Sequence, residues 1–541
     1  MRPLLFAVPL LLILACGDSA SSVDPETADA GPGIGPGGQD AGSAPDSAVA
    51  PDAAVAPSSP TEAVARANVT QGVRLTWKAP AVGGAITSYT VAMAPLGGKV
   101  RISGTSAVIT GLTVGESYTF TIRATNGAGT GPSSESTKAV TVVDGPTPPE
   151  SFIACGADQI AQLRADVKIG GPDDIKGALT YNAYFDGSAG VSMLTPARVA
   201  IPALPFTHGG RKNAAKLHYV ITALDAKGVE SVESAEDATT PDSAVHDSIF
   251  VTSYVGAVQA VEIVDCFSKL PTGVTPPARL LKGASTTIQT STYNTIAVDG
   301  PRALLYYRKP TSILVFANAT TITGDVAPVR TIAGSLTKLT NGGGVALDAT
   351  RNIFYVMDSS GAILVYPGAS AADGNVAPAR SIAGAATKLG NGYALWIDVT
   401  NDRLYVAVGT NVLVFDSAST ATGDIAPKRI ISAVGETQPS FGVTVDATKD
   451  VLYASARSSG AIHTFVASTA DGATAPLHSV TGLNTPMGLG VFNDQLIMIS
   501  DGNGTLVSQW SNAAKVNGAA APDKVISLPT MVNSGAFAYV P

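Results

Sequence analysis

Apolar and polar residues alternate with a period of two through most of the chain after residue 61, and this alternation predicts β-strands. Between residues 245 and 541 the strand-like runs come in groups of four. In one such group, residues 343–384, the predicted strands are a first ending at Asp348, a second at 353–357, a third ending at Tyr366 and a fourth at 379–384.

These groups of four strands also repeat as sequence. A glycine begins a similar stretch six times, as in GDVAPVRTIAG and GNVAPARSIAG. The leading glycines are Gly273, Gly324, Gly374, Gly423, Gly472 and Gly518. Their separations of 51, 50, 49, 49 and 46 residues, combined with strand-like content, predict the blades of a β-propeller.

The two ends of this region predict how the propeller closes. Residues 248–283 contain a second, a third and a fourth strand, but no first strand precedes them. The chain's end, SGAFAYVP at 534–541, resembles the first-strand segments of the other blades. We therefore expect Phe537 to Val540 to pair with Ile249 to Ser253, which gives six blades with one shared between the two ends.

A basic residue follows the proline of each repeat by two positions, on the predicted fourth strand. These residues are Arg279, Arg330, Arg380, Arg429, His478 and Lys524. The fourth strand is outermost in a blade, so a proline and a cation there are expected to prevent edge-to-edge pairing. The alternative is a basic belt that binds a ligand.

An aspartate closes the first strand of four blades, at Asp299, Asp348, Asp398 and Asp446. Each begins a turn such as DATRN, in which an Asp side chain accepts hydrogen bonds from its own backbone. A shared catalytic role for these carboxylates is the functional alternative.

The loops that lead into the first strands carry amide side chains at the predicted mouth of the central channel. They are Asn294, Asn341, Asn391, Gln438, Asn484 and Asn533. Turn chemistry accounts for asparagine in such loops, whereas the functional interpretation is a neutral ring of amides that contacts a ligand.

The blade pattern over residues 245–541 resembles the NHL and TolB-like group of six-bladed propellers. Lactonases on related propellers hold a divalent metal with Glu, Asn and Asp at the channel. The positions named above carry amides and not carboxylates, which counts against that chemistry, so we expect no metal and no cofactor.

Two further domains precede the propeller. Residues 61–144 resemble a fibronectin type III domain, a two-sheet β-sandwich, through Trp77, Tyr89 and a Leu112–Tyr118 spacing typical of a tyrosine corner. Residues 145–241 resemble a diverged copy without the tryptophan. Domains of this kind serve as spacers or docking modules, and their aromatic residues are expected in the core.

The first sixty residues predict export and attachment to a membrane. Residues 1–15 combine Arg2 with a short apolar stretch, and ILAC, ending at Cys16, resembles the lipobox of bacterial lipoproteins, whose cysteine is lipidated. Residues 16–60 form an acidic, Gly-, Ala- and Pro-rich linker without a hydrophobic period, so we expect a disordered tether. An ordinary signal peptide with an incidental cysteine is the alternative.

Charge and cysteines restrict the possible partners. The formal net charge is −8, but residues 17–60 hold seven acids and no base, and the folded part is nearly neutral. A near-neutral body gives no electrostatic basis for nucleic-acid binding. Cys155 and Cys266 are the only other cysteines, and they form either a disulfide between the second domain and the first blade or two unpaired thiols. The five histidines show no metal-ligand spacing.

The predicted fold class is therefore all-β: two fibronectin type III-like sandwiches followed by a six-bladed propeller. We expect a non-enzymatic, lipid-anchored protein of the cell envelope, at the outer membrane and either periplasmic or surface-exposed, whose propeller binds a protein or glycan. The alternatives are a hydrolase or lyase acting at the channel mouth and a structural or adhesive surface component. The ligand, the membrane leaflet and the oligomeric state do not follow from the sequence.

Replacing Cys16 by Ser is expected to abolish incorporation of labelled fatty acid, because the acyl chains are attached to the cysteine at the lipobox. Metabolic labelling with palmitate, followed by immunoprecipitation, measures this directly. A Cys16→Ser protein that still carries label would contradict lipid attachment at this residue.

Overall fold

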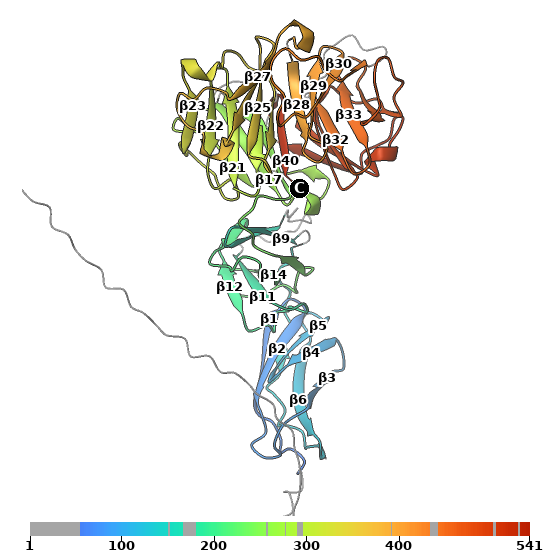
Figure 1. Cartoon of the computed structure of the whole chain (residues 1–541). Coiled ribbons are helices and arrows are strands. Elements are labelled where there is room, and N and C mark those ends of the chain that lie inside the picture. Colours follow the sequence, from blue (N-terminus) through green and yellow to red (C-terminus); the bar gives the residue numbers. More distant parts are fainter. Residues whose placement is uncertain are drawn as a thin grey trace, which may run out of the picture. The chain divides into compact units, whose positions relative to one another are not determined.

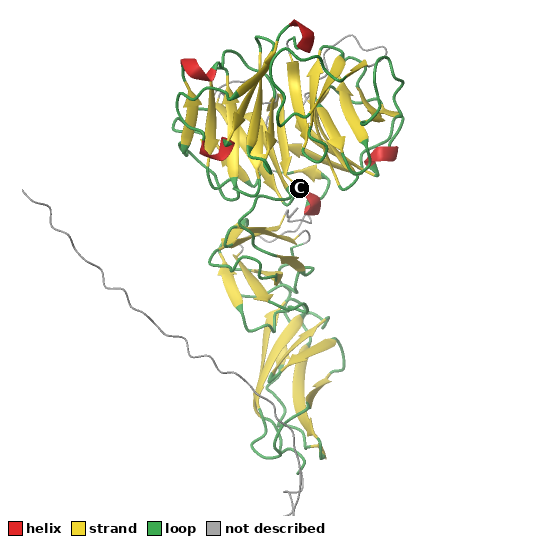
Figure 2. Ribbon diagram, in the orientation of Figure 1, coloured by secondary structure: helices red, strands yellow, loops and turns green. Residues whose placement is uncertain are grey.

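The computed structural model describes residues 55–149, 152–165, 180–255, 258–275, 277–288, 296–390, 392–432, 442–500, 505–528 and 531–540. Residues 55–541 form one compact unit, built almost entirely of strands (Figures 1 and 2). In the described ranges, helix is limited to short 3₁₀ turns: η1 (Phe267–Lys269), η2 (Ser335–Thr337), η3 (Ala369–Ala371), η4 (Ala385–Thr387) and η5 (Ala513–Lys515).

The first sandwich packs two sheets around the predicted aromatic core. Trp77 is 5% exposed and Tyr118 is 4% exposed, while the partly buried Tyr89 meets the Trp77 ring edge-on at 5.2 Å. One sheet has the order β1 (Thr61–Val69), β2 (Gly72–Lys78), β5 (Ser106–Thr110), β4 (Lys99–Ser103). The other is β3 (Ser88–Ala94), β6 (Ser117–Asn126), β7 (Gly129–Thr130), with β8 (Val140–Thr141) also on β6.

The second sandwich has the same two-sheet plan with a different core. Its second strand lacks the tryptophan of the first sandwich. Leu163 on that strand is fully buried instead, among Phe152, Tyr181 and Tyr219. Its sheets are β13 (Phe206–His208), β10 (Ile160–Ala165), β9 (Phe152–Ala157), and β12 (Arg198–Ile201), β11 (Thr180–Asp186), β14 (Leu217–Leu224), β15 (Asp237–Thr239).

Glu230 joins the two sandwiches through a buried carboxylate. Its Oε2 pairs with Arg74 of the first domain at 2.8 Å. Its Oε1 accepts hydrogen bonds from Thr222, Tyr184 and Asn182 at 2.6, 2.7 and 3.0 Å. Because every acceptor site of this buried charge faces a donor, the contact can be held without the penalty of an unpaired carboxylate.

The propeller region contains six sheets with the strand order predicted from the repeat. Five are continuous along the chain: β20 (Ile296–Asp299), β21 (Leu304–Lys309), β22 (Ser312–Phe316), β23 (Arg330–Ala333); β24 (Val345–Asp348), β25 (Ile353–Asp358), β26 (Ala362–Pro367), β27 (Arg380–Ala383); β28 (Gly392–Asp398), β29 (Arg403–Val408), β30 (Asn411–Asp416), β31 (Arg429–Ser432); β32 (Val443–Asp446), β33 (Val451–Ala456), β34 (Ala461–Val466), β35 (His478–Val480); and β36 (Pro486–Phe492), β37 (Gln495–Ser500), β38 (Thr505–Ser511), β39 (Lys524–Leu528).

The sixth sheet combines the two ends of the domain. Its order is β40 (Met531–Val540), β16 (Ser248–Val255), β17 (Val258–Asp265), β19 (Arg279–Leu281), so the red last strand lies among green ones (Figure 1). Ile249 faces Tyr539 and Val251 faces Phe537, which is the predicted pairing. The first strands contact one another in the order β40, β20, β24, β28, β32, β36 and back to β40.

The leading glycine of each repeat pairs with the fourth strand of the preceding blade. Gly374 donates its N–H to the carbonyl of Thr331 at 2.9 Å and accepts from Ala333 at 3.0 Å. Its φ is 68°, a backbone conformation that glycine adopts without strain. The conformation, and not a lack of space, favours glycine here, because a Cβ would meet nothing within 4 Å. The other parallel bridges are Leu281↔Gly324, Ile382↔Gly423, Ile431↔Gly472, Val480↔Gly518 and, between β18 (Gly273–Val274) and β39, Gly273↔Ile526.

This pairing corrects the expectation of an exposed outer edge on the fourth strand. Each edge is covered by two backbone hydrogen bonds or more from the next blade, so the proline and the cation are not its only protection. The glycine repeat therefore connects successive blades around the ring.

A disulfide joins the second sandwich to the first blade. Cys155 of β9 and Cys266, directly after β17, are bonded with their Cα atoms 5.8 Å apart. Both lie in an apolar cluster with Ile153 and Phe537. Lys269 strengthens the same joint by bonding Asp237 at 2.8 Å.

Replacing Phe537 by Ala is expected to lower the free energy of unfolding of the propeller by about 3–5 kcal/mol, because the ring is 5% exposed in the closing sheet. Deleting residues 534–541 should cost more, since the pairs with β16 are lost as well. Calorimetry of residues 17–541 measures both, and Leu477→Ala, at a side chain 49% exposed, is the matched control. Equal transition temperatures for the deleted and intact proteins would contradict a closing role for β40.

Candidate functional site

One face of the propeller carries the loops that connect successive blades. Because successive strands of a blade are antiparallel, the loops that lead into the first strands lie at the same end as the turns between the second and third strands. We call this end the loop face. The opposite end carries the turns that follow the first strands.

The predicted amides fall on this face only in part. Asn341 is exposed just before β24; its carbonyl accepts a hydrogen bond from Arg308 at 2.7 Å, and its side-chain oxygen accepts the N–H of Gly342 at 2.8 Å. Asn484 is exposed just before β36. Asn533 lies inside β40, a strand and not the loop that was expected. Asn294, Asn391 and Gln438 lie outside the described residues.

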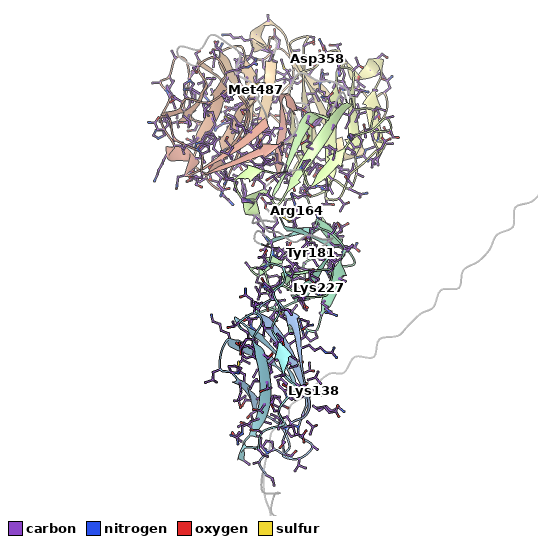
Figure 3. The ribbon with its side chains drawn as sticks, turned by 180° about the vertical axis from the view of Figure 1, so that it is seen from behind. Lys138, Arg164, Tyr181, Lys227, Asp358 and Met487 are labelled. Atoms are coloured by element: carbon purple, nitrogen blue, oxygen red, sulfur yellow. A yellow bond between two sulfur atoms is a disulfide. The ribbon has the colours of Figure 1, made fainter. Side chains whose placement is uncertain are left out.

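A buried ion pair beneath the loop face was not anticipated. Arg308 is the last but one residue of β21 and its side chain is fully buried, and Asp358, labelled in Figure 3, ends β25 of the next blade. Their nearest atoms are 3.5 Å apart. Burial lowers the pKa of Arg308 to about 10, and the charge of Asp358 opposes that fall, so the guanidinium stays charged at neutral pH.

Asp358 is held as a carboxylate by donors from its own blade. Burial alone would raise its pKa, but hydrogen bonds from the N–H and hydroxyl of Thr340 and from the N–H of Ser360 lower it. The pair thus fixes the segment 340–341 that presents Asn341. A sequence signal existed, because the residues aligned with Arg308 in the next three blades are the uncharged Met357, Ala407 and Ser455.

The aspartates that close the first strands serve as turn caps, as expected from the sequence. Asp348 is fully buried, accepts the N–H of Arg351 at 2.8 Å and pairs with the Arg351 guanidinium at 2.8 Å. The same guanidinium reaches the carbonyl of Val399 in the next blade at 3.0 Å. Asp299 and Asp398 accept the corresponding N–H groups of Arg302 and Asn401.

Four of the six fourth-strand cations, Arg279, Arg380, Arg429 and Lys524, connect neighbouring blades, so these four form neither a free basic belt nor mainly an edge guard. Arg380 donates to the carbonyl of Ala421 at 3.0 Å, and Arg429 donates to that of Ala470 at 3.1 Å, each in the following blade. The equivalent donors at the closing blades are Arg279, to Ala319 and Ile322, and Lys524, to Phe267 and Ser268. These side chains connect neighbouring blades.

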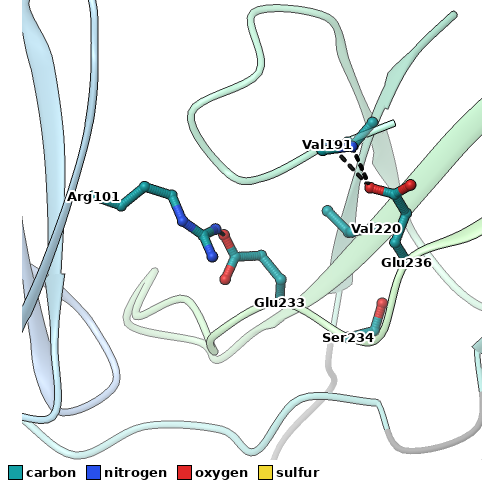
Figure 4. Close-up of a pocket in the computed structure, with 7 residues that line it drawn as sticks. Arg101, Val191, Val220, Glu233, Ser234 and Glu236 are labelled. Atoms are coloured by element: carbon teal, nitrogen blue, oxygen red, sulfur yellow. Dashed lines mark hydrogen bonds and ion pairs between the residues drawn. The ribbon is translucent and has the colours of Figure 1, made fainter. Parts of the chain in front are cut away.

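A polar cleft of about 550 Å³ lies where the two sandwiches meet (Figure 4). Its carboxylates are engaged: Glu233 accepts from Arg101 at 2.7 Å, and Glu236 accepts from the N–H groups of Gly190 and Val191 at 2.8 Å. Burial opposes ionisation of Glu236, but the bonds from Gly190, His218 and Val191 hold its pKa below the ordinary value. These acids fix a loop, and they are not poised for proton transfer.

Residues 58–140 match the fibronectin type III domain family. No curated protein matches the chain. The chain is similar to a solved structure of a nidogen/laminin complex, with 13% identity, 53% of this chain and 92% of that chain covered, and a TM-score of 0.35. It is also similar to the β-propeller domain of Cps50 (Swd1) from Myceliophteria thermophila (10% identity, 44% and 71% covered, TM-score 0.32) and to the WD40 β-propeller domain of Doa1 (13%, 53% and 84%, 0.34).

No group of three or more His, Cys, Asp or Glu side chains that could hold a metal occurs among the described residues. Within the same ranges no helix has the length and apolarity needed to span a bilayer. The carboxylates named above are committed to backbone donors or to arginines, so no acid–base or nucleophilic arrangement emerges from them.

Purified protein is expected to contain no stoichiometric divalent metal, because Asn341 and Asn484, the predicted amides exposed on the loop face, are uncharged and the carboxylate of Asp358 already accepts hydrogen bonds. Elemental analysis after gel filtration without chelator tests this. One tightly held ion per chain would contradict the expectation and favour the hydrolase or lyase alternative.

Proposed function

We propose that this chain is a lipid-anchored protein of the bacterial cell envelope whose propeller binds a protein or glycan partner at the loop face, without catalysing a reaction. The sandwich and propeller architecture fits a binding or structural role. The lipobox-like ILAC at Cys16 and the acidic linker support display at a membrane surface, with the sandwiches as spacers.

The proposal rests on a difference between two kinds of residue in a blade, those that recur in the other blades and those that change from blade to blade. The repeated glycines and aspartates, and most of the repeated cations, are used to connect neighbouring blades or to cap turns. The loop face instead carries residues that change from blade to blade, such as the Arg308–Asp358 pair below Asn341. A surface whose residues are not repeated in the other blades can present side chains that suit one ligand.

Amide side chains favour recognition of polar, uncharged groups. Asn341 and Asn484 are exposed and offer both a donor and an acceptor for peptide groups or sugar hydroxyls. A buried ion pair that immobilises the segment carrying Asn341 reduces the ordering needed on binding.

The double variant Asn341→Ala and Asn484→Ala is expected to lose at least about tenfold in captured ligand, since each lost hydrogen bond costs about 1 kcal/mol or more at an interface. Residues 17–541 are immobilised and exposed to labelled envelope proteins and glycans. Thr350→Ala, an exposed change on the opposite face, is the control. Capture that is unchanged in the amide variant but lost on cutting off residues 17–60 would place binding elsewhere and overturn the proposal.

A further inference from the structure

Strand β3 of the first sandwich has an open edge. It is outermost in its sheet and pairs with β6 over seven consecutive residue pairs, from Ser88↔Thr125 to Ala94↔Thr119, without a bulge. Alternate side chains along it are exposed: Ser88, Thr90, Ala92 and Ala94. Across the described ranges no strand pairs with its other side.

The edges of the other sheet of the first sandwich and the outer edges of the propeller blades are protected in recognisable ways. β1 carries Glu62 and Arg66 and has two register shifts, and β4 carries Lys99 and Arg101 over only five residues. The outer strands of the propeller blades are covered by the glycine of the next repeat. By contrast β3, SYTVAMA, has no charge, no proline and no bulge, and such an edge is a template for another strand.

The direction of its backbone groups follows from the bonds of β6. The carbonyls of Phe120, Ile122 and Ala124 accept N–H groups from the segment after β6, at 2.8–2.9 Å. The N–H groups of Phe120 and Ile122 are also used on that side, by hydroxyls of Thr137 and Ser134.

The residues of β3 that face these positions are Met93, Val91 and Tyr89. Because residues of an antiparallel pair alternate between bonded and non-bonded positions, these three direct their N–H and C=O groups away from β6. The open edge therefore presents three donors and three acceptors to an approaching strand.

We propose that this edge pairs with the same edge of a second copy of the chain, antiparallel, with the two-fold axis through Val91. In this register Val91 faces Val91 of the second copy, and Tyr89 faces Met93 of the second copy. It is the one register that uses all three outward-facing residues of both strands, and it makes six backbone hydrogen bonds. An isologous contact of this kind is self-limiting, so it gives a dimer and not a fibre.

The side chains are self-complementary in this register. No charged residue lies on either strand, Thr90 faces Ala92 of the second copy, and Tyr89 meets the thioether of Met93, a favourable contact.

One strand pair is smaller than the interface of a stable soluble dimer, which buries about 1,200–2,000 Å². The dimer is therefore expected to be weak in dilute solution and to be captured best by a covalent bond at the axis. Directly bonded strand residues have Cα atoms about 5.5 Å apart, within the range that a disulfide spans.

The test uses residues 17–541, which keep the whole compact unit that begins at Val55 and lack Cys16. Under mild oxidation Val91→Cys is expected to form a disulfide-linked dimer at least about tenfold faster than Thr90→Cys. The native Cys155–Cys266 bond leaves no other thiol to compete.

Thr90→Cys is a stringent control because Thr90 is the more exposed side chain, so random collision would favour it. In the proposed register it faces residue 92, so mixing Thr90→Cys with Ala92→Cys should give a mixed dimer that neither gives alone. Dimers that form from Val91→Cys no faster than from Thr90→Cys would overturn the proposal.

A second measurement does not depend on Val91→Cys folding. One protein carries Thr90→Glu with Ala92→Glu, and another carries Thr90→Lys with Ala92→Lys, all at exposed positions. Sedimentation at high concentration should show each alone as a monomer and the mixture as a dimer. A mixture that stays monomeric at the concentration where the unchanged protein dimerises, or an unchanged protein that never dimerises, would equally overturn the pairing.

Discussion

Backbone pairing at the edges of sheets is the constraint on which this structure depends. Six four-stranded blades would present six outer edges, and the propeller covers each with the glycine that begins the next repeat. Gly374, for example, covers β23 of the preceding blade. β40 meets the same requirement on the inner side by completing the sheet of β16, β17 and β19. The ring is thus held by hydrogen bonds that run from blade to blade, and the side-chain bonds of Arg380 and Arg351 follow the same direction.

Under the proposed function, this arrangement separates stability from recognition. Residues that recur in the blades contact the neighbouring blade, and residues that occur in one blade are found at the loop face. Arg308 and Asp358 show the separation most clearly, since a buried ion pair gives little net stability in itself but fixes the geometry of the groups around it. The open edge of β3 in the first sandwich offers main-chain groups instead, and the proposed pairing of two copies rests on them.

Much of the architecture followed from the sequence because strands have a period of two and blades have a period near fifty residues. That is enough to place β24 to β27 and the pairing of Phe537 with β16. The partner of each leading glycine was not predictable, because a glycine in a turn motif does not reveal which strand some forty residues away it will bond. The aspartate caps were predictable since their partners lie three residues onward, whereas Arg308 meets a residue fifty positions away. Asn533 was misplaced because the closing strand is longer than the repeat suggested.

The shared blade also sets an order of events in the life of the chain. Each of the five continuous blades consists of consecutive residues, so each can form as soon as its residues are made. The sheet of β16 has to wait for β40, which follows the other described propeller strands along the chain. Until β40 pairs with β16, the second sandwich, already complete, is attached to a propeller that is not yet closed. Closure of the ring therefore depends on a contact between its earliest and its latest strands, and it is the last step in assembly of the propeller.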